Sequence, residues 1–205
     1  MPMNSELNPK TLTKGLIHLA KVDKELHCLI KLNKDLTLYE RPSGFEGLVN
    51  LIVEQQLSIA SAKAIFNRVK SNISPLTAEK LLKTNTVKLK EAGLSKQKIN
   101  YCRGIAKAVI SRELIFEDFV NKTNEEIIKD LTRFKGIGEW TAECYLLGCM
   151  GRVDAWPASD LGLQVAIKNI KGLKSRPNKL TTVKISETWR PFRSVAALIL
   201  WSSYD

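Results

Sequence analysis

Apolar residues recur at helical spacing along almost the whole chain, and this periodicity restricts the fold more than any other feature of the sequence. Leu12, Leu16 and Leu19 form one such series, and residues 99–110 carry another. Spacings of three and four residues place apolar side chains on one face of an α-helix, whereas a period of two indicates a strand. The only brief candidate strand is residues 36–39. The sequence therefore predicts an all-α fold of about ten helices.

Capping residues mark the starts of several of these helices. Ser58 and Ser95 each stand directly before an apolar helical pattern, where a hydroxyl can accept a backbone N–H. Thr123 and Glu126 have the spacing of a capping box, in which each side chain bonds the backbone of the other residue. We expect helices that include, with approximate ends, residues 45–56, 58–71, 95–112 and 192–203.

The chain is strongly basic, with 32 Lys and Arg against 21 Asp and Glu and a formal net charge of +11. Such a surplus favours a polyanionic partner, because basic side chains that neutralise phosphates release condensed counterions. A basic protein without such a partner has the same composition, so charge alone leaves both alternatives open. No apolar run reaches the roughly 18 residues of a membrane span, and residues 1–10 lack the apolar core of a signal peptide. We therefore expect no membrane partner and a cytoplasmic protein, nucleoid-associated in a bacterium or nuclear in a eukaryote.

The four cysteines, Cys28, Cys102, Cys144 and Cys149, show neither a Cys-x-x-Cys pair nor a zinc-binding spacing. The two histidines do not complete a metal site with them. Such cysteines are typical of inert thiols in a reducing compartment. Because the chain also lacks a cysteine-rich C-terminal cluster, we expect no iron–sulfur cluster.

Residues 131–142 contain the most informative pattern in the chain. One helix is expected to end there and another to begin directly after Gly136 and Gly138. The glycines permit a tight turn and let the backbone approach a ligand without interference from a Cβ, while Ile137 can pack between the two helices. The amides of the turn would point outward at a helix N-terminus beside Lys135, which suits a phosphate. A tight connection between two helices without any ligand would need the same glycines.

The wider pattern around these glycines resembles a known family. Residues 135–142 read Lys-Gly-Ile-Gly-Glu-Trp-Thr-Ala, residues 151–157 form a loop that contains Gly and Pro, and Asp160 follows. In this order they resemble the DNA glycosylase superfamily named for a helix-hairpin-helix followed by a Gly/Pro-rich loop and an Asp. Residues 45–58 and 92–98 are similar to its alkylated-base branch, the 3-methyladenine DNA glycosylase II proteins, in a compact form.

The resemblance implies an enzyme that acts on double-stranded DNA containing damaged bases. It would flip out alkylated purines of the N3-methyladenine and N7-methylguanine type and hydrolyse the N-glycosidic bond, leaving an abasic site in base excision repair. We expect a monomer with no required cofactor. One chain would form two helical lobes, one from about residues 1–44 and 142–205 and the other from about residues 45–141, with the active site in the cleft between them.

Asp160 is the candidate catalytic residue. Cleavage of an N-glycosidic bond leaves positive charge on the deoxyribose, and a nearby carboxylate stabilises that charge and can orient the attacking water. Taken alone, a carboxylate directly before a helix is equally typical of an N-cap, and we expect Asp154, a second carboxylate, to be structural. Trp140 occupies the position where, by resemblance, strand-cleaving members have a Schiff-base lysine, and an indole supplies no such amine. The resemblance therefore implies a monofunctional enzyme.

Aromatic side chains are expected to line the pocket for the flipped base, because a cationic alkylated purine gains cation–π energy there. Family position indicates Trp140 and Trp201, and Trp156 lies close to Asp160 in sequence, although core packing explains Trp201 equally well. The resemblance also suggests Na⁺ or K⁺ at the hairpin, bound by the backbone carbonyls of Thr132, Phe134 and Ile137.

An intercalating side chain must fill the gap that a flipped base leaves. The resemblance places it at Gln56 or Leu57, where a packing role in the turn between two helices is equally compatible. The complete set of expected DNA-binding residues is Gln56, Leu57, Lys135, Gly136, Ile137, Gly138, Glu139 and Thr141.

Two other functions stay compatible with the sequence. One is a non-catalytic protein that recognises DNA structure through the hairpin. The other is a bifunctional glycosylase with lyase activity on oxidised bases, against which Trp140 argues.

Overall fold

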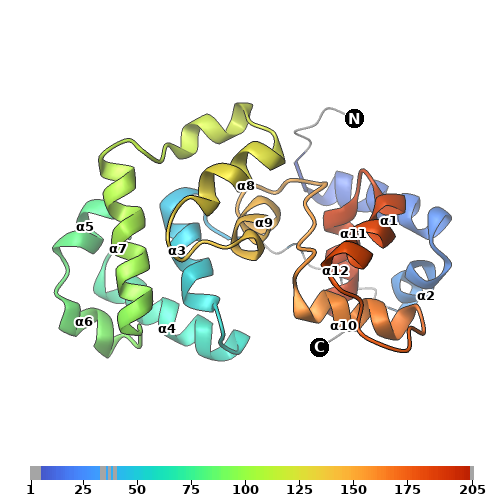
Figure 1. The fold of residues 1–205 in the computed structure, drawn as a ribbon, viewed down its shortest axis with the longest axis horizontal. Helices are drawn as coiled ribbons and strands as arrows, with labels where there is room; N and C mark the ends of the chain where they lie inside the picture. The colour runs from blue at the N-terminus through green and yellow to red at the C-terminus, as the bar shows by residue number, and fades with distance from the viewer. Residues whose placement is uncertain (1–5, 33–35, 37, 39–40, 204–205) are drawn as a thin grey trace. The chain divides into compact units, whose positions relative to one another are not determined.

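The computed structural model describes residues 6–32, 36, 38 and 41–203 (Figure 1). The only β-type pairing among these residues is an isolated bridge between Glu6 and Arg152, so the all-α prediction is confirmed for the described part of the chain. The candidate strand at residues 36–39 lies partly outside the described residues. The helices are α1 (Pro9–Val22), α2 (Lys24–Leu32), α3 (Gly44–Glu54), α4 (Ile59–Asn72), α5 (Ala78–Lys83), α6 (Thr86–Glu91), α7 (Lys96–Ile110), the 3-10 helix η1 (Phe116–Asn121), α8 (Asn124–Thr132), α9 (Glu139–Gly148), α10 (Leu161–Ile170), α11 (Lys179–Ser186), the 3-10 helix η2 (Glu187–Trp189) and α12 (Arg193–Ser202).

Side chains cap several helices as the sequence predicts. The hydroxyls of Ser58 and Ser95 each accept the backbone N–H three residues further on. Thr123 and Glu126 form the complete capping box, with the Thr123 amide donating to the Glu126 carboxylate at 2.7 Å and the Glu126 amide donating to the Thr123 hydroxyl at 3.2 Å. These contacts satisfy N–H groups that have no partner inside the helix. Among the described residues, no helix has the length and apolar character needed to span a membrane.

The chain divides into two compact units. Unit 1 comprises residues 1–40 and 146–205, and unit 2 comprises residues 41–145. In unit 1, α12 packs against α1, α2 and α10, and α10 also contacts α11. In unit 2, α7 packs against α3, α5 and α6, and α3 also contacts α4.

The core of unit 1 contains a buried carboxylate, Asp23, between α1 and α2. Its Oδ1 accepts the amide of Leu26, while its Oδ2 accepts the ammonium of Lys171 at 2.6 Å and the indole N–H of Trp189 at 2.8 Å. Burial alone would raise the pKa of Asp23, but these hydrogen bonds outweigh it and hold the pKa below its usual value. The carboxylate therefore ties the start of α2 to the segments on either side of α11.

The core of unit 2 is built around α3, which is buried on almost every side. Leu48, Val49, Leu51, Ile52 and Val53 are completely buried. A helix that is apolar all round belongs in the interior of a fold. The loop that follows α3 is therefore anchored to the most deeply buried element of the unit.

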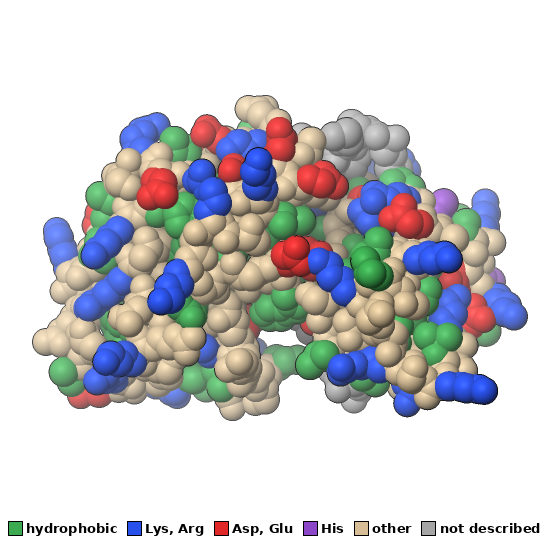
Figure 2. Space-filling model, in the orientation of Figure 1, with side chains coloured by type: hydrophobic (Ala, Val, Ile, Leu, Met, Phe, Trp, Pro, Cys, Tyr) green, Lys and Arg blue, Asp and Glu red, His purple; other side chains and the backbone are tan. Residues whose placement is uncertain are grey.

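Basic side chains are concentrated in one part of unit 2. Residues 59–110, which form α4 to α7, contain eleven Lys and Arg but only two Asp and Glu, whereas the rest of the unit has six basic and ten acidic residues. Figure 2 shows basic side chains, in blue, spread over the area formed by these helices. A local surplus of this kind attracts polyanions more strongly than the same charges dispersed among carboxylates.

Candidate functional site

The predicted hairpin lies between α8 and α9, and its two glycines have different structural roles. Gly136 has a φ of +96°, and a Cβ added there would lie 2.2 Å from the ring of Tyr101. Both the backbone conformation and the close approach of Tyr101 therefore require glycine at this position. A Cβ added at Gly138 would meet no atom within 4 Å, and its φ lies outside the left-handed region. Folding of the hairpin therefore does not require glycine at position 138, although close approach of a ligand would.

The side chains around the hairpin divide into buried and exposed ones. Ile137 is 4% exposed, so it packs inside unit 2, and its amide donates to the carbonyl of Phe134 at 3.1 Å. Lys135 and Glu139 are exposed on either side of the turn. Thr141 is only 2% exposed, and its hydroxyl accepts a hydrogen bond within the protein. Because its side chain is buried, Thr141 supports the hairpin from inside rather than presenting a side chain for DNA.

The second predicted DNA-binding segment is the loop between α3 and α4. The helix predicted to reach Gln56 ends at Glu54, because Gln56 has a φ of +57° that an α-helix does not accommodate. Gln56 is exposed, and the side chains of Leu57 and Ile59 are 40% and 67% exposed. The loop and the first residue of α4 thus present apolar side chains to solvent directly after a helix that is mostly buried.

One side chain connects this loop to the hairpin, and another connects it to α7. The Gln55 amide donates to the carbonyl of Gly136 at 2.9 Å and to the hydroxyl of Thr141 at 3.0 Å. The Lys98 ammonium donates to the carbonyls of Val53 and Gln55 at 2.7 and 2.8 Å, at the C-terminus of α3, where a cation stabilises the unpaired carbonyls. Burial lowers the pKa of Lys98. The loop, the hairpin and the start of α7 are therefore held together by direct hydrogen bonds.

Asp160 lies in unit 1 and is the N-cap of α10. Its Oδ1 accepts the amide of Leu163 at 2.8 Å and the indole N–H of Trp201 at 3.0 Å. The side chain is half-buried. A role as N-cap and a role as catalytic carboxylate are thus compatible for Asp160, because capping the helix fixes the carboxylate in one orientation beside an aromatic ring.

The loop that leads to Asp160 is fixed by buried polar side chains. The hydroxyl of Ser194 donates to the carbonyl of Arg152 at 2.6 Å and accepts the amide of Ala155 at 3.0 Å. Asp154 accepts hydrogen bonds from Arg190 and Arg193, at 2.6 and 2.8 Å, which is the structural role expected for it. These contacts anchor residues 152–155 to α12, the helix that also carries Trp201.

The three tryptophans proposed for the base pocket occupy different surroundings. Trp201 is half-buried and bonded to Asp160, whereas Trp140 is half-buried near the start of α9 in unit 2. Trp156 is 5% exposed and packs edge-on against Trp189, with 5.3 Å between ring centroids. Trp156 is thus packed in the core of unit 1, and its part in substrate binding stays a prediction.

The cysteines are mostly buried, as expected of inert thiols. Cys102, Cys144 and Cys149 are buried, and burial raises the pKa of Cys102 to about 12, while Cys28 is exposed. Within the described ranges of the chain, no three His, Cys, Asp or Glu side chains gather as metal ligands would.

Comparisons with known proteins agree with this arrangement of motifs. The family model described as HhH-GPD superfamily base excision DNA repair protein matches residues 49–191. The chain is 34% identical to DNA-3-methyladenine glycosylase 1 of Schizosaccharomyces pombe, over 94% of this chain and 88% of that protein. It is 30% identical to the alkylbase DNA glycosidase-like protein mag2 of the same organism, over 90% of each. The solved structure of Schizosaccharomyces pombe 3-methyladenine DNA glycosylase in complex with abasic DNA matches with a TM-score of 0.84 and 32% identity, over 93% of this chain and 96% of that one.

Proposed function

Because the chain belongs to the HhH-GPD superfamily of base excision DNA repair proteins, we propose that it is a monofunctional DNA glycosylase for alkylated purines. Its substrates would be N3-methyladenine and N7-methylguanine in double-stranded DNA, and its product an abasic site. The observation that carries this proposal is the half-buried carboxylate of Asp160, held in one orientation by the Leu163 amide and the Trp201 indole. The names of the relatives support the choice of alkylated bases.

In this proposal the hairpin binds the DNA backbone. Gly138 leaves the outer side of the turn open, so a phosphate can approach the backbone amides at the start of α9. Lys135 and the positive end of the helix dipole add attraction for a phosphate. Because backbone amides contact phosphates and not base edges, this contact would be independent of DNA sequence.

The loop between α3 and α4 would fill the space left by the flipped base. Leu57 is the better candidate for intercalation because its apolar side chain is 40% exposed, and Gln56 precedes it in a left-handed conformation. An apolar wedge between base steps compensates part of the cost of unstacking, which is a few kcal/mol.

In the proposed reaction, the bond between C1′ of the deoxyribose and the base nitrogen breaks, and its electron pair leaves with the base. An alkylated purine is cationic before cleavage and neutral afterwards, so it departs without a protein acid. Asp160 would stabilise the positive charge that develops on the sugar. Water then adds to C1′ and releases a proton to the carboxylate or to solvent. The hydrogen bonds to Oδ1 fix the carboxylate before the charge develops, so no reorientation is needed.

Strand cleavage by a lyase step would require an amine that attacks C1′. At the position where strand-cleaving relatives would have a Schiff-base lysine, this chain has Trp140, whose indole nitrogen is not a nucleophile of this kind. The hairpin carbonyls of Thr132, Phe134 and Ile137 stay candidates for a Na⁺ or K⁺ ion. The Phe134 carbonyl already accepts the Ile137 amide, which leaves one of its two lone pairs for a cation. The proposed reaction uses no step at that ion.

The test is base release from methylated duplex DNA by the parent chain and Asp160→Asn. The amide of asparagine keeps an oxygen for the Leu163 and Trp201 donors but removes the charge, so we expect base release to slow by about 100-fold or more. Asp154→Asn is the matched control, because Asp154 is the structural carboxylate; its release rate should stay near that of the parent at a temperature where it is folded. A parental rate in Asp160→Asn would exclude the assigned role.

Two further outcomes separate the alternatives. DNA binding without base release from alkylated, deaminated or oxidised lesions would indicate a non-catalytic protein that recognises DNA structure. A covalent DNA complex trapped by borohydride would indicate a lyase and would contradict the monofunctional assignment.

A further inference from the structure

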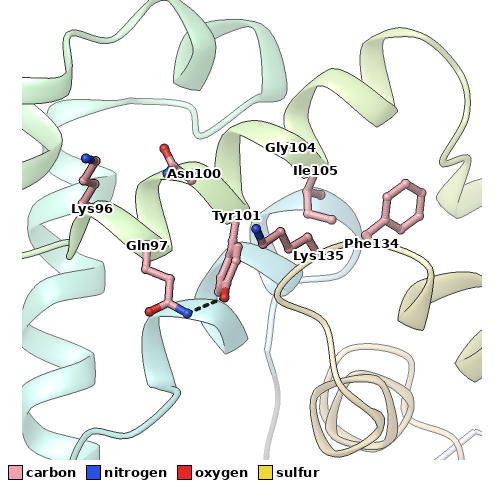
Figure 3. A pocket seen from close by; sticks show the side chains of 8 residues that line it. All are labelled: Lys96, Gln97, Asn100, Tyr101, Gly104, Ile105, Phe134 and Lys135. Atoms are coloured by element: carbon pink, nitrogen blue, oxygen red, sulfur yellow. Dashed lines mark hydrogen bonds between the residues drawn. The ribbon is translucent and has the colours of Figure 1, made fainter.

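A pocket of about 480 Å³ lies in unit 2 beside the hairpin (Figure 3). We call it the α7 pocket. It is formed by one face of α7, from Lys96 to Ile105, and by Phe134 and Lys135, the two residues directly before Gly136. The pocket is therefore continuous with the turn that we propose to bind DNA. Of the residues that line it, only Lys135 belongs to the proposed contact between the hairpin and a phosphate.

The charge of the α7 pocket favours an anion. Its lining contains two ammonium groups, Lys96 and Lys135, and the side-chain amides of Gln97 and Asn100, but no carboxylate. In the described part of the chain, neither lysine takes part in an ion pair. Figure 3 shows the two lysines at different sides of the pocket, with the Lys135 side chain directed toward α7. An anion at either ammonium group would form charge-assisted hydrogen bonds without displacing an ion-pair partner.

Tyr101 separates the Lys96 and Asn100 side of the pocket from the hairpin. Its ring packs against Gly136. Its hydroxyl oxygen accepts a hydrogen bond from the Gln97 amide and is directed away from Asn100 (Figure 3). Tyr101 therefore forms the wall of the pocket next to the hairpin and is not one of the donors to the anion.

The surroundings indicate a polyanion as the source of that anion. The pocket opens on α7, which belongs to the segment 59–110 that holds most of the net positive charge of the chain. A DNA strand bound by the hairpin would bring its neighbouring phosphates toward the pocket, because Phe134 and Lys135 directly precede the turn and also line the pocket. A DNA phosphate would gain both the local contacts and the longer-range attraction of α4 to α7.

We propose that the α7 pocket binds a second backbone phosphate of the DNA duplex, beside the phosphate held by the hairpin, through Lys96 and Asn100, which lie four residues apart on one side of α7. This proposal rests on the proposed function, because it extends the DNA contact made by the same hairpin. It assigns the pocket to affinity and to placement of the duplex, not to cleavage of the glycosidic bond.

The experiment measures binding of a short duplex with an abasic-site analogue as a function of salt concentration. Replacement of one phosphate-binding lysine, Lys96→Gln, should reduce the slope of log K against log salt by about 0.9. Lys90→Gln is the matched control, since Lys90 is exposed in the same unit and lies outside the pocket; its slope should match that of the parent. An unchanged slope in Lys96→Gln, or an equal reduction in both variants, would overturn the proposal.

Two further variants test the pocket without altering a lysine. Asn100→Asp is nearly isosteric and exposed, so it should fold normally, but it places a carboxylate where a phosphate would lie and should weaken binding several-fold. Tyr101→Phe removes only a hydroxyl that is directed away from Asn100, so it is the control and should bind the duplex like the parent. Parental affinity in Asn100→Asp would also overturn the proposal.

Base release by the same variants separates this proposal from the proposed function. At saturating DNA, the control Lys90→Gln should release base at the parental rate, because it alters neither Asp160 nor the α7 pocket. If the parent releases no base but the two lysine variants still differ in slope, the glycosylase proposal fails and the phosphate site stands. If the parent releases base but Lys96→Gln binds like the parent, the phosphate site fails alone.

Discussion

Gly136→Ala is expected to destabilise the protein because the hairpin closes against the ring of Tyr101. The added Cβ would lie 2.2 Å from Cγ of that ring, and the backbone at this position has a φ of +96°. The conformational cost for a residue other than glycine in left-handed backbone is roughly 1–2 kcal/mol. Forcing extra atoms into a packed contact typically costs about 1–3 kcal/mol. We therefore expect Gly136→Ala to lower the free energy of unfolding by about 2–5 kcal/mol.

A double-mutant cycle separates the two contributions. Tyr101→Ala removes the ring atoms that the new Cβ would meet but leaves the backbone of the hairpin unchanged. In that background Gly136→Ala should cost only the conformational part, about 1–2 kcal/mol. The measurement is urea unfolding of the parent, both single variants and the double variant at one pH, followed by tryptophan fluorescence. An equal cost in both backgrounds would refute the contact between Tyr101 and the hairpin.

Gly138→Ala is the matched control for this cycle. A Cβ at that position meets open space and requires no unusual φ, so stability should change by less than about 1 kcal/mol. If a phosphate approaches the turn from that side, the same methyl group should weaken DNA binding measurably. Gly136→Ala and Gly138→Ala are thus expected to separate folding of the hairpin from its proposed contact with DNA.

Gln55→Leu should lower the free energy of unfolding by about 1–3 kcal/mol, because it removes both hydrogen bonds to the hairpin and leaves the buried hydroxyl of Thr141 without its donor; urea unfolding at parental stability would contradict this. The buried pair in unit 1 predicts a pH dependence: Asp23 has a lowered pKa when folded, so its stabilisation is present at neutral pH and is lost as pH falls below about 4. Lys171 has a raised pKa, since its bonds to Asp23 and Glu25 outweigh burial, so its stabilisation is lost only as pH rises above about 10.4. Asp23→Asn should unfold at a lower temperature than the parent at pH 7, and its unfolding temperature should depend less on pH in the acid range. Unfolding temperatures of the two proteins that fall in parallel with decreasing pH would contradict the assignment.

Local patterns in the sequence were sufficient to predict the helical fold and the position of the hairpin. Capping residues are local, so Ser58, Ser95 and the box of Thr123 and Glu126 could be identified from spacing alone. Asp160 became the catalytic candidate only through the resemblance to the glycosylase family, because a carboxylate directly before a helix is equally typical of an N-cap. Periodicity and capping act over a few residues, and their consequences can be read within one element.

Contacts between distant segments could not be predicted in this way. Asp160 and Trp201 are 41 residues apart, and Gln55 is 81 residues from the carbonyl that it binds. The burial of Trp156 depends on Trp189, which no local pattern connects to it. The different roles of Gly136 and Gly138 also depend on Tyr101. The sequence alone does not distinguish the two glycines, because the residue that separates their roles lies on another helix.

The hydrogen bonds of Gln55 and Lys98 have a consequence for how a DNA-bound protein would search for damage. They hold the loop with Leu57 at a constant offset from the turn at Gly136. If the turn binds a phosphate, the position of that phosphate therefore determines which nucleotide Leu57 contacts. The protein would then move along the duplex one phosphate at a time, with the hairpin and Leu57 moving together. To leave an undamaged base, the hairpin would have to release its phosphate, because Leu57 would not withdraw alone.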